Sequence, residues 1–433
     1  MMRLRYIFRL RWIGVGFVLA ALGLLGLKLI PTEEEKAARE LAQNLEARLM
    51  VAQLLENKIQ RHDWSEDVEA ELDGSSKALR VRFTLDASLQ QFADQIFKRY
   101  KPDYGALFLY DAKSGRVLAL SSFEKGQPTS QSLALRATYP AASVFKIVTA
   151  TAAVDKAGIN PGHTIRFNGG NYTLYRKNVM TDRMTRWTRT VTLRDAFSKS
   201  LNTAFGRLAL ENLEPETINE YANRFLFNQD LPTDFPLEKS FALVPSEKNY
   251  ELTQVASGFN RFTRMSPVVG SMIAASIVND GKVIVPYMVD ELRHADTNEI
   301  IYQGAALEKG QIMTEESATK MRELMEETVL SGTSRKSFRA LVKNKKFREV
   351  QMGGKTGHLT GDNPKGRTDW FVGYAFDDDN SLAIAAITVN EKYWTIKSSQ
   401  IAQMMFRKYF EPVLAQRVAA TQDNSRGPSS RRP

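Results

Sequence analysis

The feature that most constrains this chain is a long apolar run near its N-terminus, at residues 12–30. The run contains one charged residue, Lys28, close to its far end, where a lysine side chain can reach the surface of a bilayer. An apolar helix of about 20 residues is long enough to cross the hydrocarbon core of a membrane. We therefore predict a single transmembrane helix at 12–30, with a short segment before it and a large globular part after it.

The charges on either side of this run predict its orientation. Acidic residues 33–35 follow it, and four arginines precede it: Arg3, Arg5, Arg9 and Arg11. Because basic flanks stay on the cytoplasmic side, we expect residues 1–11 in the cytoplasm and the rest on the periplasmic face of the inner membrane. A cleaved signal peptide is the alternative, but the run is long for one and no small-residue cleavage site follows it.

Residue types in short supply argue against several kinds of chemistry. The chain has no cysteine, which removes disulfides, cysteine nucleophiles and thiolate metal sites. Its four histidines are widely spread and lack metal-ligand spacing, so we expect no metal and no other cofactor. The net charge of +10 lies partly in the two chain ends, and we identify no basic run interleaved with aromatic residues between them. Nucleic acid is therefore not an expected partner.

Composition and periodicity predict three parts after the membrane span. Residues 31–77 are assigned to a helical stalk, because apolar residues recur near helical spacing over 33–62. Residues 78–412 form the main domain, in which strands are predicted towards both ends and helices between them. Residues 413–433 are polar, and we expect them to be a disordered tail.

The order of elements in the main domain indicates its fold class. Strands are expected near both ends, at 80–85, 104–110, 117–120, 348–356, 369–376 and 382–389. Helices are expected at 143–157, 192–210, 216–226, 267–279, 315–330 and 397–411. This order predicts an α+β domain in which an antiparallel sheet, made from the two chain ends, is flanked by helices.

The first motif with chemical content is an S-x-x-K pattern, Ser143 to Lys146. The same pattern occurs at 122–125 and 317–320, but only Ser143 opens an almost wholly apolar helix. A lysine one turn along lies on the same helix face, so its amine can reach the serine hydroxyl. Because burial disfavours the ammonium form, this amine can act as the base that serine needs to become a nucleophile.

Two further motifs follow in order. Ser200-Leu201-Asn202 lies in or beside the predicted helix at 192–210, where serine and asparagine are poor helix formers. Lys355-Thr356-Gly357 comes just before the late strands, where glycine permits close approach of another chain. Taken alone, the first has a helix interruption or cap as its alternative, and the second is more often a simple turn.

Together and in this order, the three motifs resemble those of the penicillin-binding proteins, which share them with the serine β-lactamases. The resemblance covers residues 78–412 and includes segments outside the motifs: 84–90, 111–119, 267–282 and 370–374. It implies three catalytic residues, namely a nucleophile, its base and a proton relay: Ser143, Lys146 and Ser200. It also implies a second set of residues that bind the amide and the carboxylate of the substrate: Asn202, Lys355, Thr356, Gly357 and His358. The backbone amides of Ser143 and His358 would form the oxyanion hole.

Position 358 departs from the family pattern, in which a threonine or serine follows K-T-G. His358 removes a hydroxyl that helps to bind the carboxylate, although Thr360 can substitute for it. We predict altered β-lactam affinity, with a pH dependence near neutrality if His358 titrates. The alternative is a solvent-facing side chain at a position where only the backbone amide acts.

The function implied by the resemblance is that of a membrane-anchored peptidoglycan D,D-transpeptidase. Its partners would be peptidoglycan stem peptides, β-lactams as covalent inhibitors, the membrane through one helix, and other cell-wall synthesis proteins. We see no room for a glycosyltransferase domain before residue 78. The sequence does not distinguish this transpeptidase from a D,D-carboxypeptidase, in which water is the acceptor.

Two other functions stay open on the same fold. A β-lactamase needs a deacylation base, for which Glu238 is the candidate by position, although its surroundings lack a suitable loop pattern. A non-catalytic β-lactam receptor or divisome scaffold is the other, and the intact motifs argue against it.

Overall fold

The structure is a computed structural model of the 433-residue chain and describes residues 33–72, 74–127 and 131–425. The chain separates into two compact units, residues 1–50 and 51–433. Most of helix α2 (Glu33–Leu54) belongs to the first unit, and the other described elements belong to the second. The predicted membrane span at 12–30 lies outside the described residues. Among the residues that are described, no helix combines the length and apolar composition that a membrane crossing requires.

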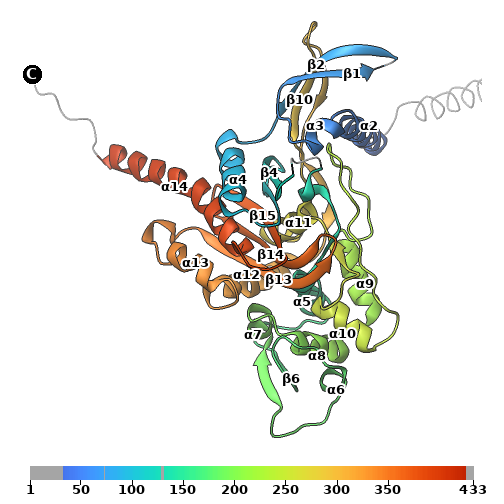
Figure 1. Ribbon diagram of the computed structural model, residues 1–433, viewed down its shortest axis with the longest axis vertical. Coiled ribbons are helices and arrows are strands. Elements are labelled where there is room, and N and C mark those ends of the chain that lie inside the picture. Colours follow the sequence, from blue (N-terminus) through green and yellow to red (C-terminus); the bar gives the residue numbers. More distant parts are fainter. Residues whose placement is uncertain (1–32, 73, 128–130, 426–433) are drawn as a thin grey trace, which may run out of the picture. The chain divides into compact units, whose positions relative to one another are not determined.

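A five-stranded antiparallel sheet forms the core of the second unit, in the order β13-β14-β15-β3-β4 (Figure 1). Its strands are β3 (Tyr104–Asp111), β4 (Val117–Glu124), β13 (Gln351–Asp362), β14 (Lys365–Phe376) and β15 (Ser381–Asn390). Strands from the beginning of the domain pair with strands from its end, because β15 lies beside β3. The predicted α+β fold, with an antiparallel sheet made from two chain ends, is confirmed.

Local sequence explains the pairing of β3 with β4. At the turn between them, Asp111 Oδ1 accepts hydrogen bonds from the backbone nitrogens of Lys113 and Ser114, at 3.0 and 2.7 Å. Gly115 closes the turn with a φ of +75°, a conformation that side chains disfavour. Every residue of β15 is buried, as in a strand that is covered on both faces.

Helices cover both faces of this sheet. Three of them share one apolar cluster with the sheet on the first face: α4 (Ala87–Tyr100), α13 (Arg335–Val342) and α14 (Ser398–Ser425). On the other face lies α11 (Pro267–Val278), whose 12 residues are all buried. A Cβ atom on Gly270 of α11 would lie 3.1 Å from a Val372 side-chain atom and 3.2 Å from Ala385, so this helix packs directly on the strands.

The remaining helices and short strands surround the motif residues. The helical elements are η1 (Leu133–Leu135), η2 (Ala142–Phe145), α5 (Lys146–Thr151), η3 (Ala152–Lys156), α6 (Arg176–Val179), α7 (Leu193–Ser198), α8 (Asn202–Asn212), α9 (Pro215–Arg224), α10 (Tyr250–Ser257), α12 (Glu315–Leu330) and η4 (Lys345–Phe347). The paired short strands are β5 (Tyr139–Pro140) with β8 (Arg264–Met265), β6 (Thr164–Phe167) with β7 (Arg189–Thr192), and β9 (Lys282–Val285) with β12 (Leu307–Gln311).

A separate four-stranded sheet has the order β1-β2-β10-β11. Its strands are β1 (Asp67–Leu72), β2 (Ser75–Phe83), β10 (Val289–His294) and β11 (Ile300–Gln303). Only β2 has a counterpart among the predicted strands. In β1, apolar residues alternate with acidic ones, a strand pattern that the prediction of a helical stalk overlooked.

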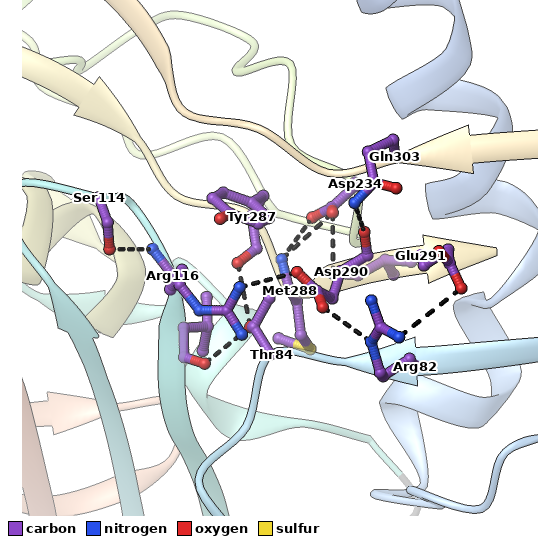
Figure 2. Close-up of polar contacts among 12 residues, drawn as sticks. Arg82, Thr84, Ser114, Arg116, Asp234, Tyr287, Met288, Asp290, Glu291 and Gln303 are labelled. Carbon is purple, nitrogen blue, oxygen red and sulfur yellow. Dashed lines mark hydrogen bonds and ion pairs between the residues drawn. The ribbon is translucent and has the colours of Figure 1, made fainter.

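Carboxylates join this sheet to neighbouring segments (Figure 2). The fully buried Asp234 accepts a hydrogen bond from the backbone nitrogen of Met288 at 2.9 Å. Asp290 binds Arg82 of β2 at 2.8 Å and Arg116 of the β3–β4 hairpin at 2.7 Å. Burial raises the pKa of Asp290, but the hydrogen bonds from both arginines outweigh it and hold the pKa below its ordinary value. Asp290 therefore carries a negative charge shared by the two sheets.

Two predicted helices differ from the structure. The helix predicted at 192–210 is interrupted, since α7 ends at Ser198, Ser200 has a φ of +58°, and α8 begins at Asn202. The stretch predicted as one helix at 143–157 consists of a 3-10 turn, a short α-helix and a π-helical turn in succession.

The predicted boundaries of the main domain also move. Within the predicted stalk at 31–77, the described helices are α2 and α3 (Glu56–Gln60), but β1 and the start of β2 follow. Helix α14 continues past the boundary predicted at 412 and ends at Ser425. Residues 413–425 are therefore helical, and the prediction of a disordered tail is wrong for them.

Candidate active site

Ser143 lies in the helical turn that follows β5. The next residues of this helical stretch, 144–151, are all buried, whereas Ser143 is partly exposed. Its hydroxyl is therefore accessible at the end of an otherwise covered helix. Ala142 before it has a φ of +49°, in a region that costs an L-residue about 1–2 kcal/mol. Such strain persists only where surrounding contacts impose it, and it collects at functional sites.

Gly258 allows a neighbouring helix to hold this strained turn. A Cβ atom at Gly258 would lie 1.8 Å from the carbonyl oxygen of Ala142 and 3.1 Å from the backbone nitrogen of Ser143. Gly258 also has a φ of +67°, with which it ends α10 in the left-handed conformation. Glycine at this position therefore lets the end of α10 rest on the backbone that positions Ser143.

Lys146 is fully buried and its amine is 2.9 Å from Ser143 Oγ. Lys146 Nζ also lies 2.7 Å from Asn202 Oδ1 and 2.5 Å from the backbone oxygen of Ser257. Burial, together with the charge of nearby Lys355, lowers the pKa of Lys146 well below its ordinary value. A neutral amine has two hydrogens, which the Asn202 and Ser257 oxygens can accept, and its lone pair then faces the Ser143 hydroxyl. This is the geometry of a general base.

Ser200 occupies the break between α7 and α8. Its Oγ accepts a hydrogen bond of 2.8 Å from Lys355 Nζ, which also donates to the backbone oxygen of Thr356 at 2.8 Å. Lys355 is fully buried, and this burial lowers its pKa to about 7. The interruption of the predicted helix thus brings Ser200 to a lysine 155 residues further along the chain.

Asn202 connects the base to a neighbouring segment. Its Oδ1 accepts from Lys146, while its Nδ2 donates to the backbone oxygen of Tyr172 at 2.9 Å. Its backbone nitrogen, at the start of α8, donates to the oxygen of Asn171 at 3.0 Å. The amide orientation is therefore determined from both sides.

Strand β13 is an edge strand of the main sheet and passes beside Ser143. A Cβ atom at Gly357 would lie 3.2 Å from a Val144 side-chain atom and 3.3 Å from the backbone nitrogen of Ser143, so glycine lets the strand approach the helix end. Thr356 Oγ1 lies 2.6 Å from Thr333 Oγ1. The free edge of β13 can therefore align an extended peptide next to the nucleophile.

His358 is half exposed and does not simply face solvent. It lies opposite Asp369 of β14, and its Nε2 contacts the Asp369 Oδ1. The Lys397 Nζ is 3.4 Å from the same imidazole nitrogen and 3.6 Å from the carboxylate. The Trp394 ring meets the imidazole edge to face, with 6.0 Å between centroids. These neighbours hold the ring in one orientation beside β13.

The structure brings all eight predicted site residues together, and it adds residues that the motifs did not reveal. These are Gly258, Ser257, Thr333, Asp369, Trp394 and Lys397. Asp369 is the first residue of the strand predicted at 369–376, but only the register of β13 with β14 places it opposite His358. Within the described part of the chain, no group of three or more His, Asp or Glu side chains is arranged to hold a metal ion.

Glu238, the candidate deacylation base, is engaged elsewhere. Its Oε2 accepts a hydrogen bond from the backbone nitrogen of Ala137 at 2.9 Å, and its Oε1 lies 3.7 Å from Arg136 Nε. The three oxygens around Lys146 Nζ belong to other residues. The arrangement therefore supplies a base for attack by Ser143, and among the described contacts of Lys146 Nζ there is no carboxylate.

Sequence comparisons relate the chain to one family. The family model described as "Penicillin binding protein transpeptidase domain" matches residues 105–411. Stage V sporulation protein D of Bacillus subtilis is 24% identical over 351 residues, which are 76% of this chain and 52% of that protein. Peptidoglycan D,D-transpeptidase PbpA of Mycobacterium tuberculosis is 24% identical over 348 residues, which are 72% of this chain and 67% of that protein. The chain thus spans about half the length of the first relative.

Solved structures share the fold. The crystal structure of PBPA from Mycobacterium tuberculosis aligns with a TM-score of 0.63 at 22% identity, covering 76% of this chain and 82% of that one. The imipenem acyl-enzyme complex of penicillin-binding protein A from the same organism aligns with a TM-score of 0.62 at 22% identity, covering 76% and 79%. At these identities the likeness establishes the fold, and the chemistry rests on the side chains of this chain.

Proposed function

We propose that this chain, which belongs to the penicillin-binding protein transpeptidase family, is a peptidoglycan D,D-transpeptidase with Ser143 as its nucleophile. The observation that carries the proposal is the contact of 2.9 Å between the buried Lys146 amine and the Ser143 hydroxyl. Serine attacks a carbonyl carbon only when a base takes its proton, and a lysine with a lowered pKa can do so near neutral pH.

Acylation follows from the positions of these groups. Ser143 Oγ attacks the carbonyl carbon of the penultimate D-Ala, and Lys146 takes the hydroxyl proton. The backbone amides of Ser143 and His358 face the developing oxyanion, while Lys355 and Thr356 bind the terminal carboxylate. The C–N bond then breaks, the departing amine receives a proton through Ser200, and D-Ala leaves behind an ester on Ser143.

The second half-reaction decides the enzyme class. In a transpeptidase, the amine of a neighbouring stem peptide attacks the ester carbon, loses a proton to Lys146 and releases Ser143. In a carboxypeptidase, water takes the place of that amine. The contacts of Glu238 with Ala137 and Arg136 engage the one carboxylate that was the candidate deacylation base. This disfavours a β-lactamase, and the acceptor assay described below distinguishes transfer to an amine from transfer to water.

Residues 12–30 are proposed to anchor the enzyme in the inner membrane, with the catalytic domain on the periplasmic side. The support is the sequence itself, in which arginines precede the apolar run and acidic residues follow it. Other cell-wall synthesis proteins are proposed partners on the basis of the family.

The proposal is tested by incubating the full-length chain, in detergent, with a penicillin and measuring its intact mass. We expect one stable acyl adduct, which is absent from Ser143→Ala and retained in Ser317→Ala. Ser317 is a matched control, because it belongs to the second S-x-x-K pattern but lies at the start of α12.

The outcomes separate the alternatives. Rapid loss of the adduct with turnover of the drug would instead support a β-lactamase. Absence of any adduct would support a non-catalytic scaffold. Adding an acceptor amine to the enzyme acylated by a D-Ala-D-Ala peptide should yield the amide rather than the acid, and the reverse ratio would indicate a carboxypeptidase.

A further inference from the structure

A basic and aromatic extension lies next to the candidate active site. Residues 164–192, called the arm below, consist of β6, β7 and the connection between them, which includes α6. The two strands pair antiparallel, with Thr164 opposite Thr192 and Phe167 opposite Arg189. Figure 1 shows β6 and α6 with α7 and α8 at the lower end of the view.

The arm carries an unbalanced positive charge. Six of its residues are basic and all six are exposed: Arg166, Arg176, Lys177, Arg183, Arg186 and Arg189. Its single acidic residue, Asp182, pairs with Arg207 of α8. In the described part of the chain, no carboxylate lies within ion-pairing distance of any of the six. Their charge is therefore available to an anionic partner.

Large apolar side chains are exposed among these cations. Tyr172, Tyr175, Met184 and Trp187 have exposed fractions of 63%, 59%, 58% and 71%. The Arg186 guanidinium lies 4.8 Å from the centre of the Trp187 ring. Residues 172–189 are thus a basic run interleaved with aromatic residues. The prediction that no such run lies between the two chain ends is therefore wrong. Exposed apolar groups clustered in this way mark an interaction surface.

The arm is built as a defined surface by its own hydrogen bonds. Asn168 accepts from Thr188 Oγ1 at 2.7 Å and donates to the backbone oxygen of Arg183 at 3.1 Å. Arg189 donates to Asn171 Oδ1 at 2.7 Å. These contacts cross from one side of the arm to the other, so Arg183 and Trp187 are presented by an ordered loop. A partner that binds it does not bear the full entropic cost of ordering the arm.

The inner edge of the arm is joined to the catalytic motif. The backbone oxygens of Asn171 and Tyr172 accept the two hydrogen bonds that Asn202 donates. The next residue of α8, Thr203, donates to the Thr173 oxygen at 2.9 Å. Tyr172 therefore belongs both to the exposed aromatic surface and to the contacts that hold the Lys146 partner. The exposed surface of the arm therefore begins at residues that contact the catalytic motif.

We propose that the arm binds the peptidoglycan strand beyond the reacting peptide, as a glycan–peptide polymer that bears carboxylates. Guanidinium groups form directional pairs with the carboxylates of stem peptides, and flat aromatic rings pack against the apolar faces of sugar rings. Nucleic acid has a similar demand for arginines and aromatic rings, but the attachment of the arm to Asn202 favours the polymer that the enzyme itself processes. The inference rests on the proposed function, and it adds a noncatalytic contact between the enzyme and its substrate polymer.

The test compares three full-length variants with the unchanged protein. Arg183→Glu/Arg186→Glu reverses two charges of the arm, and Trp187→Ala removes its most exposed ring. Lys343→Glu/Lys345→Glu is the matched control, because it changes the net charge equally at two exposed lysines outside the arm. The fraction of protein that cosediments with insoluble peptidoglycan is measured at low salt. It is divided by the fraction of the same preparation that penicillin can acylate, so that only folded protein is compared.

We expect the arginine variant to bind about tenfold more weakly and Trp187→Ala roughly fivefold more weakly, with the lysine control within about twofold. Amidation of the carboxylates of the peptidoglycan should lower binding of the unchanged protein to the level of the arginine variant. Equal binding by all variants, or an equal loss in the lysine control, would overturn the inference. Displacement by double-stranded DNA at lower concentrations than by soluble peptidoglycan fragments would overturn it in favour of nucleic acid. Failure of the proposed function is distinguishable, since the adduct lifetime and the ratio of amide to acid report it in the unchanged protein without any measurement of peptidoglycan binding.

Discussion

Replacing Gly258 by alanine tests whether the end of α10 positions the nucleophile. The added methyl would begin 1.8 Å from the Ala142 oxygen, whereas Cβ contacts below 3.0 Å essentially do not occur. Backbone must therefore move by at least 1.2 Å, either at Ala142 or at Gly258. Gly158→Ala is the matched control, because its φ of +66° is nearly the same as the +67° of Gly258 and no atom lies within 4 Å of its Cβ position.

Both substitutions carry the cost of alanine in a left-handed conformation, but only one of them also displaces the backbone. Alanine in the left-handed region costs about 1–2 kcal/mol in either variant, which lowers the Tm by a few degrees. Only Gly258→Ala adds the displacement, and misplacement of a reacting group by about 1 Å costs on the order of 100-fold in rate. We therefore expect acylation to slow about 100-fold in Gly258→Ala and to stay within about twofold in Gly158→Ala.

The assay is the rate of acylation by a fluorescent penicillin, measured well below the lower of the two Tm values. Thermal unfolding of both variants is recorded first, so that loss of fold is not mistaken for loss of rate. If Gly258→Ala acylates as fast as Gly158→Ala, the contact between Gly258 and Ala142 does not position Ser143, and our account of the strained turn is refuted.

Three further predictions concern the polar groups around Ser143. Because burial lowers the pKa of Lys355 to about 7, its ammonium group is present below that pH and lost above it. The kcat/KM for acylation by a penicillin carboxylate should then fall about tenfold per pH unit above 7, also in His358→Ala, and a flat profile in that range would contradict the role of Lys355. Lys146→Met should lower the acylation rate by about 10²–10⁴-fold with the fold retained, as checked by intact mass and thermal unfolding, and an unchanged rate would exclude Lys146 as the base. If Asp369 acts through His358, Asp369→Asn and His358→Ala should change penicillin affinity by the same factor, with no further change in the double variant; additive effects in titrations would show that they act independently.

Interactions between residues close in the chain were predictable from the sequence. Ser143 and Lys146 are one helical turn apart, so helical geometry alone brings the amine to the hydroxyl, and the structure places them 2.9 Å apart. The hairpin at 111–115 and the apolar strand β15 are likewise local patterns, and with the order of elements they predicted the antiparallel sheet. The three motifs, with the residue after the last one, also named eight residues that the structure brings together, although not the further residues that surround them.

The geometry that makes these residues a site was decided by tertiary contacts. Ser200 interrupts a predicted helix and adopts a φ of +58°, with its hydroxyl bound to Lys355 of β13. Asp369 reaches His358 through strand register, and Asn202 is oriented by the arm through the oxygens of Asn171 and Tyr172. Ser200 and Lys355 are 155 residues apart, so no local pattern predicts their contact. His358 and Asp369 lie in one hairpin, but their pairing requires its exact register.

The physical reason is that local helix propensity is weaker than the tertiary hydrogen bonds and acts over a shorter range along the chain. Helix propensity changes by about 0.7 kcal/mol or less per ordinary residue, and it acts on the residue and its near neighbours. Hydrogen bonds to charged groups contribute about 1.5–3 kcal/mol, and leaving such buried groups unpaired costs more. The sequence by itself therefore predicted the five strands of the main sheet and the residues proposed to carry the chemistry. Where a helix breaks and how the arm meets Asn202 depended on which distant segments the fold brings together, and which carboxylate faces His358 depended on the register of the β13–β14 hairpin.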